Sequence, residues 1–195
     1  MEMFTKIGFF LLFVVLMFSG CSKDGNGPAE SEDYYFRFKV DGIQQAYTAR
    51  DRQVNLTGSS VYDEQNGVYA INIAGMRNIL ESVKHTLTVF VSDTEGFAAG
   101  KTYSNIPGEG DDYPDFVFSM GYHDGEGNLF VAGGAGDKSL AGLYEPAFVT
   151  FTEIAEDYMS GTFSGTLNWY ESSSGTNILR GTVVISDGQF NVPRH

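Results

Sequence analysis

The chain has 195 residues, a length typical of one domain or of two small ones. It carries 12 Lys and Arg against 25 Asp and Glu, a formal net charge of -13, which argues against a nucleic-acid binder because such proteins need a basic face for phosphates. Hydrophobic residues make up 42% of the chain, enough to bury a core. The single Cys excludes a disulfide framework within one chain, and with only three His a metal centre built on Cys or His is not expected.

The first 20 residues have the pattern of a secretory signal. Lys6 precedes an apolar run over residues 7–18, broken only by Gly8. The run is too short to span a bilayer, because a spanning helix needs about 20 residues. A positive start, a short apolar stretch and small residues behind it predict a cleaved signal peptide over residues 1–20.

The end of this run, Phe18-Ser19-Gly20-Cys21, resembles a bacterial lipoprotein signal. The resemblance implies cleavage after Gly20, diacylglycerol on the sulfur of Cys21 and acylation of the new amino group by a fatty acid such as palmitate. Three acyl chains would hold the protein at a membrane, because each buried CH₂ contributes about 0.8 kcal/mol and one chain alone binds only marginally. An ordinary secretory signal followed by a free Cys is the alternative.

Residues 21–32 contain no large apolar side chain and are rich in Gly, Pro, Ser and acids, which predicts a solvated tether. Acidic residues soon after the Cys resemble the surface-export signals of Bacteroidetes-type lipoproteins, but Lys23 and Gly25 depart from that pattern. The expected location is therefore the bacterial outer membrane, in a surface-facing or a periplasmic orientation. We expect a signal over residues 1–20, a lipid-anchored tether over residues 21–32 and a single domain over residues 33–195.

From Asp33 onward the dominant hydrophobic period is two, as in strands with one buried and one solvated face. Phe36 and Phe38 alternate with polar neighbours, and the same alternation recurs around residues 69–73, 87–91, 163–169 and 179–185. Turn sequences punctuate the chain at Asp41-Gly42, at Asp187-Gly188 and at residues 66–67, 124–128 and 172–175. The pattern predicts an all-β fold, an antiparallel two-layer β-sandwich of about ten strands, with a partly closed barrel as the alternative.

One window competes with this reading. Met76, Ile79, Leu80 and Val83 have the spacing of one face of a helix. The window is too short to form a helix by itself, and we expect a loop element of one or two helical turns between strands.

Sequences near both ends of the predicted domain carry a family resemblance. Residues 38–42 read Phe-Lys-Val-Asp-Gly, residues 160–167 read Ser-Gly-Thr-Phe-Ser-Gly-Thr-Leu, and residues 181–193 read Gly-Thr-Val-Val-Ile-Ser-Asp-Gly-Gln-Phe-Asn-Val-Pro. Together they resemble a family of Bacteroidetes-type lipoproteins of unknown function. The resemblance implies a lipid-anchored β-sandwich and transfers no catalytic residue. Gly161, Gly165 and Gly181 within these motifs predict bulges or close backbone approach.

The first candidate metal site is an acidic loop that contains Glu109, Asp111, Asp112 and Asp115. Carboxylates are the hard oxygen ligands that Ca²⁺ prefers, so calcium is a candidate cofactor; a solvated acidic loop is the alternative, because the spacing matches no defined calcium motif. Residues 124–128 also begin like a calcium loop, but Leu129 stands where such a loop needs Gly. We expect a hairpin turn there.

No catalytic signature stands out. Glu153 and Glu156 are conceivable as the carboxylate pair of a glycoside hydrolase, but charges at a strand edge explain them better. His85, His123 and His195 are far apart and lack metal-ligand spacing; the first two are expected at the surface and the last is the terminal residue. No catalytic residue is predicted.

Aromatic residues are the remaining candidates for ligand binding. Exposed rings stack on sugar faces or anchor protein partners, and tyrosines otherwise cap a core with the hydroxyl in water. Trp169 is in register with Leu167 and is expected in the core. The tyrosines expected at strand ends or on polar faces are Tyr34, Tyr35, Tyr62, Tyr113, Tyr122, Tyr144, Tyr158 and Tyr170.

These features predict a lipid-anchored cell-envelope protein that acts as a non-catalytic binding or accessory module for a glycan or a protein. Nucleic acid is not an expected partner. One alternative is a surface glycan hydrolase, which requires a cleft with paired acids. The other is a purely structural envelope protein, which would expose a sheet edge or an apolar patch for self-association.

Overall fold

The computed structural model describes residues 34–49, 54–106, 117–134, 144–173 and 175–195, so the predicted signal and tether lie outside the described residues. No helix in these described ranges is long and apolar enough to cross a membrane. The elements in chain order are β1 (Tyr35–Val40), β2 (Ile43–Thr48), β3 (Leu56–Asp63), β4 (Val68–Met76), the 3-10 helix η2 (Ile79–Glu81), β5 (Thr86–Asp93), β6 (Thr102–Ser104), β7 (Phe118–His123), β8 (Leu129–Gly134), β9 (Ala147–Ile154), β10 (Tyr158–Ser173) and β11 (Thr176–Pro193).

The strands hydrogen-bond into one antiparallel sheet of eleven strands, which confirms the predicted all-β class. Its main path is β2-β1-β11-β10-β8-β7-β5-β4-β3, while β9 pairs with β10 and β6 pairs with β9. The sheet nearly closes, because Gly58 of β3 forms a bridge with Arg194 and accepts a hydrogen bond from the His195 N–H at 2.9 Å. This barrel-like closure replaces the separate sheets of the predicted sandwich.

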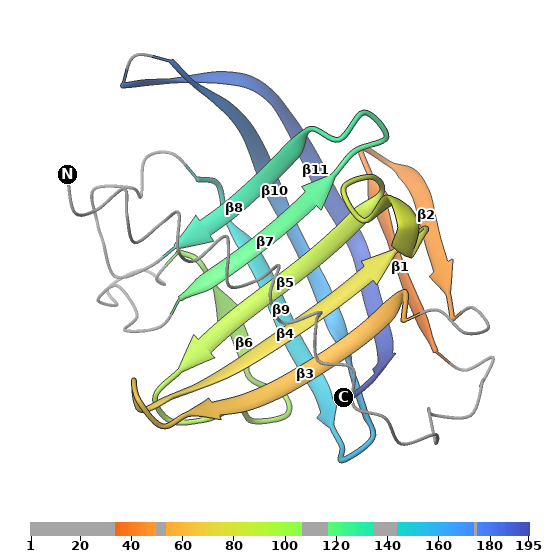
Figure 1. Cartoon of the computed structure of the whole chain (residues 1–195), viewed down its shortest axis with the longest axis vertical. Helices are drawn as coiled ribbons and strands as arrows, with labels where there is room; N and C mark the ends of the chain where they lie inside the picture. Colours follow the sequence, from red (N-terminus) through yellow and green to blue (C-terminus); the bar gives the residue numbers. More distant parts are fainter. Residues whose placement is uncertain (1–33, 50–53, 107–116, 135–143, 174) are drawn as a thin grey trace.

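Two long strands make the closure possible. β10 has 16 residues and β11 has 18, well above the usual strand length of about 5–6. The first part of β10 pairs with β9, and further along Asn168 pairs with Val131 of β8. The β10–β11 hairpin therefore belongs to both parts of the sheet, and in Figure 1 it crosses behind β3, β4, β5 and β7.

The core lies between these crossing parts and uses the predicted alternation. Phe36 and Phe38 of β1 are completely buried, and the ring of Phe36 lies 5.0 Å from that of Phe163, centroid to centroid. Phe36 also packs directly on the backbone of Gly75 in β4. There is no room for a side chain at this glycine, because a Cβ atom on it would lie 2.4 Å from Phe36 Cγ. This close approach fixes how β1 packs across the core on β4.

Two Asp-Gly pairs whose Asp residues both have a left-handed φ form different structures. Asp41 (φ 50°) and Gly42 (φ 82°) form the predicted two-residue turn between β1 and β2. The turn expected at Asp187-Gly188 is wrong, because both residues lie inside β11. There β11 carries one more residue than its partners β1 and β10, so Asp187 (φ 52°) and Gly188 form a β-bulge.

The predicted close backbone approaches are confirmed. A Cβ atom on Gly161 would lie 2.2 Å from the carbonyl oxygen of Thr150, and one on Gly165 would lie 2.5 Å from Ala147 Cβ. Both glycines also adjoin register shifts of β10, as Gly181 does on β11. Side chains at Gly161 and Gly165 would push β9 away from β10.

Two regions show the limits of local patterns. The window with helical spacing contains only η2, one short turn between β4 and β5, as expected. The alternation over residues 179–185 buries Val183 and Ile185 but leaves Leu179 exposed. Residues 176–180 at the start of β11 are all exposed, and in Figure 1 the tip of the β10–β11 hairpin extends beyond the other strands.

Candidate ligand-binding groove

Several predicted site residues lie outside the described residues. They are Cys21, Tyr113 and the four candidate calcium ligands Glu109, Asp111, Asp112 and Asp115. The lipid anchor and the calcium site therefore stay predictions. Within the described ranges, no three His, Cys, Asp or Glu side chains are grouped so that they could hold a metal ion.

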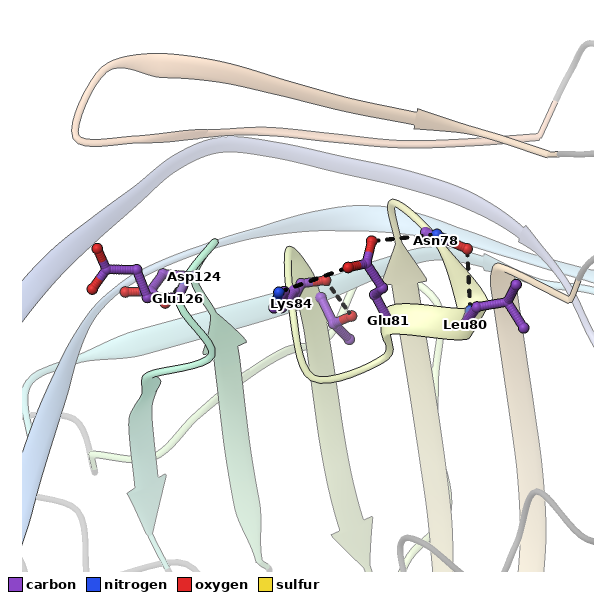
Figure 2. A network of polar contacts seen from close by, with 7 residues as sticks. Asn78, Leu80, Glu81, Lys84, Asp124 and Glu126 are labelled. Atoms are coloured by element: carbon purple, nitrogen blue, oxygen red, sulfur yellow. Dashed lines mark hydrogen bonds and ion pairs between the residues drawn. The ribbon is translucent and has the colours of Figure 1, made fainter.

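The second calcium-like stretch is the predicted hairpin turn between β7 and β8. The carboxylate of Asp124 accepts hydrogen bonds from the backbone N–H groups of Glu126 at 2.8 Å and Asn128 at 2.9 Å, and from the side-chain amide of Asn128 at 2.9 Å. These bonds engage both carboxylate oxygens within the turn. Figure 2 shows Asp124 and Glu126 beside the β4–β5 loop, where Glu81 pairs with Lys84 at 3.7 Å.

This turn predicts a pH dependence of stability. Burial disfavours the charged form of Asp124, but the hydrogen bonds from Asn128 and from backbone N–H groups outweigh it and lower the pKa of Asp124. A carboxyl with a folded pKa below its unfolded value of about 3.9 stabilises the fold above that pH, and the stabilisation disappears as the pH falls through the folded pKa. We expect Asp124→Asn to be less stable than the wild type at neutral pH and to lose less stability between about pH 5 and about pH 2.

Thermal melts of both proteins across this pH range measure the effect. The Asn side chain keeps the size of Asp but carries no titrating carboxyl. Equal losses of melting temperature in the two proteins would contradict a stabilising charge on Asp124.

The acid pair and the histidines form no shared site. Glu153 and Glu156 are exposed at the end of β9 and in the following turn, and Tyr158 donates a hydrogen bond to Glu153, which raises the pKa of Tyr158. His85 and His123 are half-buried rather than at the open surface as predicted, and burial lowers the pKa of each imidazole. His195 is exposed at the C-terminus.

The tyrosines divide into three groups. Tyr122 is 4% exposed and belongs to the core, so its predicted exposure is wrong. Tyr62 is 52% exposed and its ring lies 4.6 Å from that of Tyr69 on the neighbouring strand β4. Trp169 is half-buried against Phe130 at the margin of the core. The other described tyrosines of the predicted set are half-buried: Tyr34, Tyr35, Tyr144, Tyr158 and Tyr170.

An open groove of about 440 Å³ lies over β9, β10 and β11. Strand pairing places Ser164 opposite Phe148, and Thr162 between Thr150 and Gln189. Their side chains share the outer face of these strands, because the alternating residues Ala147, Val149 and Phe151 of β9 are buried. The groove is lined by Phe148, Thr150, Thr162, Phe163, Ser164, Ser186, Asp187, Gly188 and Gln189.

Phe148 is the aromatic residue that the sequence reasoning missed. Its side chain is 42% exposed, although large apolar rings are usually buried. The signal was present, since Phe148 is out of phase with the buried Ala147, Val149 and Phe151 of the same strand. The exposed ring of Phe148 lies at the side of the groove, where a ligand can reach it.

Two polar side chains of the groove, Gln189 and Thr150, are held by hydrogen bonds to neighbouring side chains. Arg37 donates from Nε and Nη2 to Oε1 of Gln189 at 3.1 and 2.6 Å, which leaves the Gln189 amide N–H groups available to a ligand. The Thr150 hydroxyl contacts that of Thr102 at 2.7 Å. The hydroxyls of Thr162 and Ser164 make no side-chain hydrogen bond within the described part of the chain.

Asp187 supplies the one carboxylate among the residues that line the groove. The β-bulge places it there in a left-handed conformation, and Gly188 next to it has no room for a side chain, because a Cβ atom would lie 2.3 Å from the Phe163 carbonyl oxygen. Asp187 Oδ2 pairs with Lys39 Nζ at 2.8 Å. β-Bulges re-aim side chains, and Asp187 at this bulge is among the residues that line the groove.

Comparisons with models of known protein families, with curated proteins and with solved structures give no match for this chain. The resemblance to Bacteroidetes-type lipoproteins therefore stays a prediction. The groove and its side chains are the basis on which a function is proposed.

Proposed function

We propose that this protein is a non-catalytic carbohydrate-binding module of the cell envelope, with the groove over β9, β10 and β11 as its binding site. The observation that carries the proposal is the exposed ring of Phe148 beside hydroxyl, amide and carboxylate groups on one strand face. A sugar presents an apolar C–H face and a rim of hydroxyls. An aromatic ring suits the first, and a few placed polar groups suit the second.

The groove favours binding over hydrolysis. Glycoside hydrolysis commonly uses two carboxyl groups, about 5–5.5 Å apart for retention and about 6.5–9.5 Å apart for inversion. Asp187 is the one carboxylate among the residues that line the groove, and it forms an ion pair with Lys39. This arrangement supports a binding module more than the alternative of a surface glycan hydrolase.

A glycan also fits the groove better than a protein ligand does. Protein interfaces concentrate their binding energy in central clusters of large aromatic, apolar and Arg side chains. Here a single exposed ring is surrounded by short hydroxyl side chains of β9 and β10, with Gln189 and Asp187 beyond them. These groups exchange hydrogen bonds with sugar hydroxyls readily, because each hydroxyl both donates and accepts.

The experiment that tests the proposal is an array of polysaccharides probed with the full chain in mild detergent. We expect retention on at least one polysaccharide, and release when the same polysaccharide is added in solution. Retention on none would contradict the proposal and favour the alternative of a purely structural envelope protein.

The proposal includes a lipid anchor at Cys21, a tether over residues 21–32 and a place at the outer membrane. It is supported by the lipoprotein-like sequence of residues 18–21 and by the polar composition after it. We expect the Cys21→Ser variant to lose the lipid mass and to leave the membrane fraction, because one Cys carries the whole anchor. Mass spectrometry and fractionation measure both effects, and unchanged membrane retention of the variant would contradict the anchor.

A further inference from the structure

A row of polar side chains extends the groove across the sheet. Thr102, Thr150, Thr162, Gln189 and Arg37 are successive cross-strand partners on β6, β9, β10, β11 and β1. Neighbouring strands lie about 4.8 Å apart, so the four steps of this row span roughly 19 Å. We call these five residues the polar row. Its length suits an extended chain of sugars rather than a single sugar.

The polar row ends on a positive charge. The Arg37 guanidinium lies 4.6 Å from the centre of the Tyr35 ring and donates two hydrogen bonds to the neutral amide of Gln189. Within the described residues, Arg37 forms no ion pair with a carboxylate. A guanidinium has five N–H donors, so Arg37 keeps donors for a further acceptor.

The carboxylate that lines the groove is neutralised by a neighbouring cation. Asp187, the one charged residue among those that line the groove, is paired with Lys39 at 2.8 Å, and Arg37 is the one charged member of the polar row. This local positive charge stands out in a chain whose formal net charge is -13. An anionic ligand would be repelled by most of the surface, and the polar row is where it would be accepted.

We propose, resting on the proposed function above, that the ligand is an acidic polysaccharide that contains uronic acids. One sugar ring stacks on Phe148, hydroxyls bind along the polar row, and a carboxylate further along the chain accepts hydrogen bonds from Arg37. The planar guanidinium suits a carboxylate, because the two can form parallel hydrogen bonds. Tyr35 beneath the guanidinium and Gln189 beside it hold the fork in place.

The test compares each acidic polysaccharide with its own carboxyl-reduced form, which keeps the sugar backbone and removes the charge. Polygalacturonate, alginate and hyaluronan are titrated against the full chain in detergent by calorimetry. We expect at least one of them to bind about tenfold or more tightly than its reduced form, a difference of about 1.4 kcal/mol. Arg37→Gln should abolish this preference, while Arg37→Lys should keep part of it because the charge remains without the fork.

Arg180→Gln is the matched control, because Arg180 is an exposed cation of β11 that pairs with Glu171 and does not line the groove. It should leave the preference unchanged. Equal binding of acidic and reduced forms, or loss of the preference in Arg180→Gln as much as in Arg37→Gln, would overturn the acidic ligand and leave a neutral carbohydrate site standing. Failure of every acidic and reduced form to bind would also overturn it, and the array then decides separately whether any carbohydrate binds.

Discussion

Replacing Phe36 by Ala is expected to lower the free energy of unfolding by about 3–5 kcal/mol. Phe36 is completely buried, its ring contacts that of Phe163, and it packs against the bare backbone of Gly75 across the core. Truncation removes this contact between β1 and β4 and leaves a cavity that rigid strands cannot refill. Urea unfolding of both proteins at neutral pH measures the loss.

Leu80→Ala is the control for this measurement. Leu80 is 86% exposed in the β4–β5 loop, so its truncation should change the stability by no more than about 0.5 kcal/mol. If Phe36→Ala cost less than about 1 kcal/mol, the packing of β1 on β4 would be wrong. The arrangement of β1 across the core from β4, on which the nearly closed sheet depends, would then be contradicted.

Replacing Phe148 by Ala is expected to weaken carbohydrate binding about tenfold or more, which corresponds to about 1.4 kcal/mol. The variant removes the one exposed ring of the groove and keeps its hydroxyl, amide and carboxylate groups. Because Phe148 is 42% exposed and on the outer face, the stability should change little. Calorimetric titration with a polysaccharide retained on the array measures the affinity, and a thermal melt checks the fold.

Val184→Ala is the matched control for the loss of exposed apolar surface. Val184 is 48% exposed on β11 and does not line the groove. Its affinity for the same polysaccharide should equal that of the wild type. Equal losses in Phe148→Ala and Val184→Ala, or no loss in either, would contradict a stacking role for Phe148.

The fold class was accessible from the sequence because its signals are local. Alternation identified Phe36 and Phe38 as core residues, and Asp41-Gly42 correctly predicted a hairpin turn. Asp187-Gly188 misled the same reasoning, since a turn and a bulge can both use an Asp-Gly pair with the Asp at a left-handed φ. Only the register with β1 and β10 distinguishes them, and register depends on residues far away in the chain.

The closure of the sheet and most of the groove also depend on pairing between residues that are far apart in the sequence. Arg37 and Gln189 are 152 residues apart in the sequence, so no spacing rule could bring them together. Phe148 was within reach of the sequence, because its position in the alternation of β9 predicts an outward side chain. The neighbouring groups that make this ring part of a groove follow only from the pairing of β9 with β10 and β11.

The most direct test of the central claim maps the bound carbohydrate on the protein. Amide NMR spectra of the full chain in detergent would be recorded with and without an oligosaccharide of a polysaccharide retained on the array. The proposed site predicts that the largest shift changes fall on β9, β10 and β11, at Thr150, Thr162 and Gln189 among others. Changes concentrated at the β7–β8 turn or at Tyr62 and Tyr69, with these residues unaffected, would contradict the groove as the binding site.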